Sequence, residues 1–441
     1  MTTPIHLQRR GASTCVRASL NQRTLLALPT VLWLLLSACC APATGQTAFL
    51  DRLDDALSVQ SRDGWFRSDL SVLLDLEGYY IDQRPPGVLF GDDEDFFNPR
   101  LSLYLDTRLG PHLYSLVQAR FDRGFDPRST VRDARADEYL LRYTPLDTPA
   151  LNLQVGKFAT VVGNWVPRHD SWNNPFITAP VPYENVVVIT DAKVAPGPGP
   201  FLTRRTKPDD KFSWLPVIWG PSYAAGASVF GRLDKFDYAL EVKNASLSSR
   251  PAVWNPTELG WENPTVSGRV GVRPTAAWNA GASFSVGPYL LPAARNGIAA
   301  GAAVDAREAA KDIGDFNQIT LAGDVSYTWR HWQFWGELFV SRFEVPFVGD
   351  ADTLAYYVEA KHKITPSLFA ALRWNQQFFA DVPDGRGGET WWDRDLWRID
   401  TALGYRFDRH LQAKLQYSLS HQRGSLQQGE QLVAAQLTVK F

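Results

Sequence analysis

The chain has 441 residues, with 45 Lys and Arg against 47 Asp and Glu, and 45% of its residues are hydrophobic. Residues 1–43 contain four arginines and no acidic residue, so without them 41 basic residues face 47 acidic ones and the net charge is −6. This acidic balance argues against a nucleic-acid partner, and the position of all three cysteines in the first 40 residues excludes disulfides from the rest of the chain.

Residues 1–43 have the order of a secretory signal peptide. Arginines precede the apolar run Leu25–Leu36, and small residues follow as far as Ala43. The run is too short to span a bilayer, which favours removal after export. Leu36-Ser37-Ala38-Cys39 is also similar to the lipobox of bacterial lipoproteins, which would place a lipid anchor on Cys39. Cleavage after Ala43 and lipidation of Cys39 both stay open.

Residues 44–66 are predicted to be a short periplasmic N-terminal segment. Leu50, Leu53 and Leu57 recur at helical spacing with aspartates between them, which is typical of an amphipathic helix. A mobile leader is the alternative.

From about residue 67 onward the hydrophobic period is two. In residues 69–81, Leu70, Val72 and Leu74 share one face, while Asp69 and Asp75 lie on the other. Sixteen such segments are predicted, at 69–81, 100–109, 113–122, 138–143, 151–158, 223–230, 236–242, 266–273, 278–286, 318–329, 333–343, 354–364, 368–377, 396–407, 411–420 and 433–441. Short turns alternate with longer loops between them, as in transmembrane barrels.

The last strand, Val433–Phe441, carries the most specific resemblance. It is amphipathic, ends in an aromatic residue, and resembles the C-terminal strand of bacterial outer-membrane β-barrel proteins. The resemblance implies that Phe441 belongs to a signal read by the barrel assembly machinery, and that the strand pairs with the first one. We therefore expect an all-β, transmembrane, antiparallel up-and-down barrel of about 16 strands over residues 67–441, in the bacterial outer membrane. A secreted all-β binding protein is the alternative from another class.

Residues 159–222 would form a long third external loop, rich in Pro and Trp. The architecture is similar to that of 16-stranded porins, which implies that this loop enters the lumen and narrows it. A plug, a substrate-specific gate and an external cap are the alternatives. The candidate constriction residues are Trp165, Arg168, His169, Asp170, Lys193, Arg204, Arg205 and Lys207.

Charged residues on the inward face are the candidate pore lining. They are Arg100, Asp106, Arg108, Arg120, Arg142, Arg269, Arg273, Glu337, Glu359, Arg373, Arg398, Asp400 and Lys414. Mixed signs predict weak selectivity, and most of these charges are expected to pair across strands, as Arg108 with Asp106 and Arg120 with Asp122. The basic loop residues favour a slight preference for anions. A distant similarity to phosphate-selective porins lacks a lysine or arginine ladder that would make it specific.

These features predict a porin for passive diffusion of small hydrophilic solutes. The alternative is a channel specific for anions or sugars, with the loop aromatics as a stacking track. No catalytic motif, metal-ligand spacing or cofactor motif is recognised, so neither an enzyme nor a cofactor is expected. The expected partners are outer-membrane lipid, the barrel assembly machinery and solutes, and the resemblance implies a homotrimer.

Overall fold

The structure, a computed structural model, describes residues 44–82, 95–122, 133–207, 213–300, 311–424 and 430–441. The predicted signal peptide and the candidate anchor Cys39 lie outside these residues. Residues 46–441 form one unit. Its first elements are the helix α2 (Thr44–Ala56) and the short strand β1 (Ser58–Gln60).

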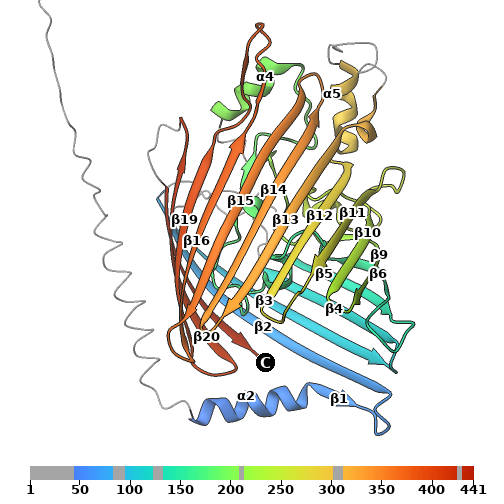
Figure 1. Cartoon of the computed structure of the whole chain (residues 1–441), viewed down its shortest axis with the longest axis vertical. Helices are drawn as coiled ribbons and strands as arrows, with labels where there is room; N and C mark the ends of the chain where they lie inside the picture. Colours follow the sequence, from blue (N-terminus) through green and yellow to red (C-terminus); the bar gives the residue numbers. More distant parts are fainter. Residues whose placement is uncertain (1–43, 83–94, 123–132, 208–212, 301–310, 425–429) are drawn as a thin grey trace, which may run out of the picture. The chain divides into compact units, whose positions relative to one another are not determined.

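Sixteen strands within the described residues form a closed antiparallel barrel, as the sequence predicts (Figure 1). Each strand pairs with the next along the chain, and β21 pairs with β2 to close the ring. The strands are β2 (Phe66–Ile81), β3 (Asp95–Leu109), β4 (Leu113–Asp122), β5 (Asp133–Tyr143), β6 (Asn152–Phe158), β9 (Ala224–Leu233), β10 (Phe236–Lys243), β11 (Thr265–Val272), β12 (Trp278–Pro288), β13 (Asn317–Trp329), β14 (Trp332–Val345), β15 (Gly349–Lys363), β16 (Leu368–Phe379), β19 (Leu396–Arg406), β20 (Leu411–Gln422) and β21 (Glu430–Lys440).

The seam of the barrel confirms the predicted pairing of the last strand with the first. Phe441 donates its backbone N–H to Val72 O at 3.1 Å and accepts the Val72 N–H at 2.5 Å. Beyond that point β1 continues along the same edge of β2, with Ser58 opposite Asp69. The edge of β2 is therefore paired along its length, and no exposed strand edge is left there to aggregate. The role of Phe441 in assembly stays a prediction.

The two faces of the barrel have opposite polarity. Large apolar side chains such as Val270, Leu321 and Leu372 are exposed on the outside, whereas their inward neighbours on the same strands are polar and mostly buried. An apolar exterior on a closed barrel matches a lipid bilayer, so the barrel spans the outer membrane. Among the described residues, no helix is long and apolar enough to cross a membrane.

One irregularity interrupts the alternation. The register between β4 and β5 shifts between Gln118 and Ala119, so that Gln118 faces Glu138 while Ala119 faces Ala136. The extra residue is Asp137, which is buried. A β-bulge of this kind aims two successive side chains to the same side of a sheet. Asp137 and Glu138 therefore both serve the inner face.

The connection from β6 to β9, residues 159–223, is here called the inner segment, and residues 208–212 of it are not described. It contains η1 (Val166–Arg168), α3 (Val181–Glu184), β7 (Val186–Val187), α4 (Pro198–Thr203), η2 (Arg204–Thr206) and β8 (Leu215–Pro216). Short elements also occur in other connections, namely η4 (Pro251–Val253), η5 (Pro292–Ala294), α5 (Arg295–Ala300), η7 (Ile313–Asp315), β17 (Asp381–Pro383) and β18 (Glu389–Trp391).

The inner segment has a hydrophobic core of its own with the strands and loops around it. Val188, Phe201 and Trp219 are buried there against Phe343 of β14 and Trp392, which follows β18. The barrel is thus filled by packed protein over part of its length. The side of the membrane from which the segment enters stays a prediction.

Candidate functional site: the inner segment against the barrel wall

The carboxylate of Glu337, on β14, binds the start of the inner segment. One oxygen accepts the backbone N–H groups of Asn164 and Trp165, the latter at 2.6 Å, and the other accepts the Tyr183 hydroxyl at 2.7 Å. The carboxylate is buried, so these donors replace the water that it would otherwise bind. Glu337 thereby joins two parts of the inner segment to one strand.

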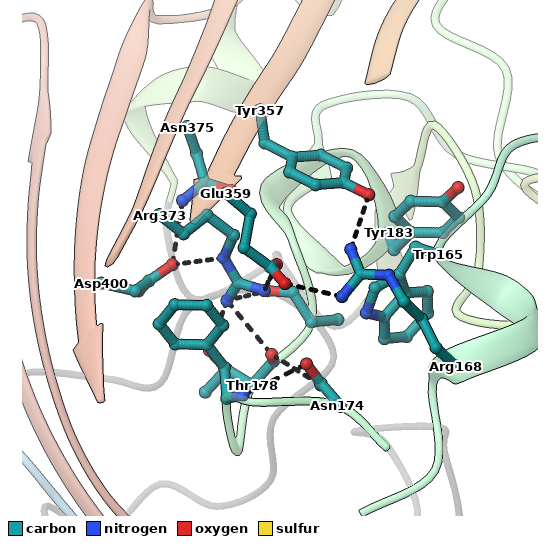
Figure 2. A network of polar contacts seen from close by, with 12 residues as sticks. Trp165, Arg168, Asn174, Thr178, Tyr183, Tyr357, Glu359, Arg373, Asn375 and Asp400 are labelled. Atoms are coloured by element: carbon teal, nitrogen blue, oxygen red, sulfur yellow. Dashed lines mark hydrogen bonds and ion pairs between the residues drawn. The ribbon is translucent and has the colours of Figure 1, made fainter. Parts of the chain in front are cut away.

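A chain of ion pairs continues along the wall, as Figure 2 shows. Arg168 of the inner segment donates to Glu359 on β15 at 2.6 Å and to the Tyr357 hydroxyl at 3.2 Å. Arg373, on β16, is fully buried, pairs with Asp400 at 2.8 Å, and donates to the carbonyls of Thr178 and Ala179 at 3.1 Å. Removing one member of such a buried pair costs about 3–5 kcal/mol, because the remaining charge stays uncompensated.

Two further cations complete the attachment. Arg398, on β19, pairs with Glu184 of α3 and with Asp400 at 2.9 Å. Lys414, on β20, donates to three carbonyls of the inner segment, those of Ser171, Asn174 and Phe176, at 2.7, 3.0 and 3.2 Å. Backbone carbonyls that have no secondary-structure partner are satisfied by these buried cations.

Six of the predicted pore-lining residues therefore contact protein rather than open water. Each is at most 5% exposed beneath the inner segment: Glu337, Glu359, Arg373, Arg398, Asp400 and Lys414. The sequence correctly placed them on the inward face, but it could not show that the lumen beside β14–β20 is occupied. Their charges stabilise the inner segment.

The charges of the predicted cross-strand pairs have further partners, although Arg120 and Asp122 do attract each other. Asp106 accepts a hydrogen bond from Tyr114, and Arg120 pairs with Asp137 at 3.2 Å. Arg108 lies opposite Tyr114 on β4. The bulge explains the second case, because it brings Asp137 to the inner face beside Arg120.

A narrow cavity of about 120 Å³ remains between the inner segment and the strands β2–β4. Arg100 and Arg120 line it from the wall, and Asp170 lines it from the inner segment. Opposite charges thus face each other across the cavity, which produces a transverse field of the kind that orients polar solutes.

The arginines at this cavity are more exposed than the carboxylates that pair with them. The Arg100 side chain is 21% exposed, whereas its partners Asp75 and Glu77, at 3.0 and 2.6 Å, are fully buried. Arg135 of β5 shows the same arrangement with Asp122 and Asp137, at 2.6 and 2.7 Å. On the wall side of the cavity the cation of Arg100 is therefore the accessible part of the ion pair, and it lies across the cavity from Asp170 of the inner segment.

The candidate constriction residues have several different roles. Trp165, Arg168, His169 and Asp170 lie at the part of the segment that meets the wall, and of these Trp165, His169 and Asp170 line the narrow cavity. Arg204 donates to the carbonyls of Val188 and Lys193, and Arg205 stacks on the Trp391 ring, 4.1 Å from its centroid. Lys207 follows η2, away from these contacts. Only the first group borders the cavity.

The aromatic residues of the inner segment do not form an open stacking track. Trp165, Trp172 and Trp219 are buried, and Trp214 packs against the core. A sugar track needs ring faces that are accessible to the solute. This observation argues against the sugar-specific alternative.

Several polar residues of the site were not among the sequence candidates, and three of them show why. Arg135 was missed because the predicted strand began only at Glu138, and Asp137 because the bulge breaks the period of two. Glu184 belongs to a four-residue helix that has no sequence signal of its own. The one feature of the sequence that distinguishes Glu184 is its position as an acidic residue between Pro182 and the hydrophobic run 186–189.

Asp393 links the inner segment to the connection between β18 and β19. It accepts the Val188 N–H at 2.9 Å and the Arg394 N–H at 2.8 Å. Burial raises its pKa to about 6, above the ordinary value of 3.8. Ionisation of this group therefore opposes folding.

The effect of Asp393 on stability should appear between about pH 4 and pH 6. In that range the folded protein keeps the proton while the unfolded chain loses it, so stability falls as the pH rises, by about 3 kcal/mol in total for a shift of two units. The difference in the free energy of unfolding between Asp393→Asn and the wild type should therefore grow by that amount, in favour of the variant, from pH 4 to pH 6. Guanidinium unfolding of the detergent-solubilised barrel at several pH values measures the gap, and a gap that stays constant with pH would contradict the assignment.

The sequence and the structure were compared with those of known proteins. No protein-family model matches the sequence, and no curated protein matches it either. Many solved structures share the fold, and three of them are described here. The anion-selective porin from Comamonas acidovorans has a TM-score of 0.51 and 10% identity over 85% of this chain and 100% of that chain. The outer membrane channel DcaP of Acinetobacter baumannii has a TM-score of 0.51 and 11% identity over 87% of this chain and 99% of that chain.

The third structure is the trimer form of OmpT, an outer membrane protein of Vibrio cholerae, with a TM-score of 0.50 and 11% identity over 85% of this chain and 99% of that chain. At such identities the likeness concerns the fold. Together with the 16 paired strands and the apolar exterior, it leads to one conclusion. The chain is a bacterial outer-membrane β-barrel with the porin fold.

Proposed function

We propose that the protein is a porin through which small hydrophilic solutes diffuse passively, with a preference for anions. The observation that supports this most directly is the exposure of Arg100 into the narrow cavity while its carboxylate partners are buried. A large barrel leaves an aqueous lumen, and a positive surface at its narrowest part raises the local concentration of anions. One structure of the same fold is described as an anion-selective porin.

The other candidate functions receive less support. The apolar exterior argues against a secreted binding protein, because such a surface would aggregate in water. Catalysis is not part of the proposal. Arg168, His169 and Asp170 turn to separate partners, namely Glu359, the Tyr223 hydroxyl and the backbone N–H of Trp172, and so do not converge on one substrate atom.

A homotrimer is part of the proposal. Small residues on the outer face of β9 and β12, Ala227, Ala280 and Ala282, would let barrels approach closely, and a similar structure is described as a trimer. Ala225 cannot take part, since it is buried beside the Trp254 backbone.

Planar-bilayer recording tests the function. The wild type should insert, show ohmic steps in groups of three if it is trimeric, and give a reversal potential in a KCl gradient that favours chloride. Arg100→Gln should lower the chloride-to-potassium permeability ratio about threefold or more, because two buried carboxylates lose their exposed cation. Arg342→Gln, which removes an exposed arginine that pairs with Asp350 and Asp352, should leave the ratio unchanged. Insertion without conductance would refute the porin.

A further inference from the structure

A second cavity, of about 610 Å³, lies on the other side of the start of the inner segment. Residues 159–164 border it on one side, and the inward faces of β4–β6 and β9–β12 form the remaining walls. Its volume falls within the range of about 300–1,000 Å³ that is usual for small-molecule sites. It is separate from the narrow cavity, with which it shares no lining residue.

The charges that line this cavity are predominantly positive. Four arginines (Arg142, Arg232, Arg269 and Arg273) face two carboxylates (Glu138 and Asp237). Arg269 and Arg273 share Asp237, at 2.6 and 3.2 Å. In the described part of the chain neither Arg142 nor Arg232 forms an ion pair at contact distance: Arg142 donates to Gln154 and feels Glu138 only at longer range, and Arg232 donates to the Asp234 carbonyl. An anion would supply the missing negative charge.

Arg142 is held in position for such a role. Its guanidinium lies between the rings of Tyr114 and Phe230, 5.1 and 5.0 Å from their centroids. Two of its nitrogens donate to the same oxygen of Gln154, at 3.1 and 2.9 Å. A cation that is fixed before binding loses little conformational entropy when it meets a ligand.

An apolar patch accompanies the positive charge. Leu116 and Leu140 lie directly opposite each other on β4 and β5 and both line the cavity, on a face of the strands that otherwise carries Gln118, Arg120 and Arg142. Phe158 and Phe230 extend this patch. Leu140 is 7% exposed and Leu116 is partly exposed, so an apolar ligand surface that covers the remaining area, mainly that of Leu116, would be favourable.

Two amide atoms at the cavity also lack partners. Asn164 Nδ2 and Asn279 Oδ1 are buried and make no hydrogen bond with the described residues. Buried polar atoms of this kind are ordinarily satisfied by water or by a ligand. They come from the inner segment and from β12, on different sides of the cavity.

We propose that this cavity binds a small organic anion, a carboxylate on a compact apolar body, with the carboxylate at Arg142 and the body against Leu116 and Leu140. An inorganic anion would leave the leucine patch uncovered, and a neutral sugar would leave the charge of Arg142 and Arg232 uncompensated. The proposal rests on the porin function only in that the ligand reaches the cavity through the lumen. It would make the channel a filter that concentrates one class of solute.

Isothermal titration of the folded protein in detergent tests the site with benzoate, its neutral isostere benzamide, and inorganic phosphate. Benzoate should bind saturably, and benzamide and phosphate should bind at least about tenfold more weakly. Benzamide loses the charge-assisted contact and phosphate loses the apolar contact, and each loss has about this effect on affinity. Arg142→Gln should weaken benzoate about tenfold, whereas Arg342→Gln should not change its affinity. Leu116→Asn, which suits a polar lumen face, should reduce the preference for benzoate over phosphate.

Heat-modifiable migration of each variant shows that the barrel has folded. Equal binding of benzoate and benzamide, no saturable binding of benzoate, or an unchanged affinity in Arg142→Gln would each refute the site. The two proposals fail separately. Chloride conductance without benzoate binding would refute the binding site and support the porin function. Benzoate binding without conductance would support the binding site and refute the porin function.

Discussion

Replacing Arg373 and Lys414 together by alanine should raise the single-channel conductance severalfold. These two side chains donate to five backbone carbonyls between Ser171 and Ala179, the stretch that borders the narrow cavity. Without them the carbonyls of Asn174 and Phe176 lose this donor, and those of Ser171, Thr178 and Ala179 keep only the donors of Gln412, Asn174 and Arg398. The stretch should therefore be held less firmly against the wall, and the lumen should widen. The expected increase reflects the small size of the narrow cavity that this stretch borders, about 120 Å³.

The matched control removes the same kinds of charge elsewhere. Arg342→Ala combined with Lys363→Ala changes an exposed arginine on β14, which pairs with Asp350 and Asp352, and a lysine at the end of β15. Neither side chain forms an ion pair or hydrogen bond with the described residues of the inner segment. Conductance should stay at the wild-type level in this control. If the Arg373/Lys414 variant folds and conducts like the wild type, the stretch between Ser171 and Ala179 does not limit the current.

Glu337→Ala should detach the start of the inner segment. The substitution removes the acceptor of three donors, the N–H groups of Asn164 and Trp165 and the Tyr183 hydroxyl. Leaving buried donors unsatisfied costs about 1–3 kcal/mol each, so we expect local opening to become easier by about 3–9 kcal/mol. Hydrogen exchange at the Trp165 amide measures this free energy, because opening exposes that amide to solvent.

Glu337→Gln distinguishes the hydrogen bonds from the charge. Its amide oxygen can still accept the two backbone N–H groups, while the hydroxyl of Tyr183 would meet an NH2 group. Most of the protection at Trp165 should therefore remain. Equal loss of protection in the alanine and glutamine variants would mean that the negative charge, not the hydrogen bonds, binds the segment.

The strands of this barrel could be predicted from the sequence because each follows the period of two over about ten residues. The predicted 113–122 coincides with β4, and most other bounds agree with the structure within a few residues. The exceptions have physical causes. β3 and β5 extend farther on one side than predicted, over Asp95–Pro99 and Asp133–Asp137, where acidic residues and the bulge interrupt the apolar alternation.

The site was harder to predict than the wall. Facing direction follows from strand phase, so the inward position of Glu337, Arg373 and Lys414 could be expected. The residues that they contact could not be predicted, because these belong to the inner segment, residues 159–223, and lie more than 150 positions away in sequence. A local sequence pattern does not predict such long-range contacts. Hence charges that looked like a pore lining proved to be attachments.

The distribution of these attachments determines when the inner segment can fold. Its contacts come from Glu241 on β10, Glu337 on β14, Glu359 on β15, Arg373 on β16 and Lys414 on β20. A partly assembled wall offers only some of them, and each alone is too weak to order a chain of this length. We therefore expect the inner segment to gain its full stability only when β10, β14, β15, β16 and β20 lie in one wall, so that the filling of the lumen is coupled to the assembly of that wall.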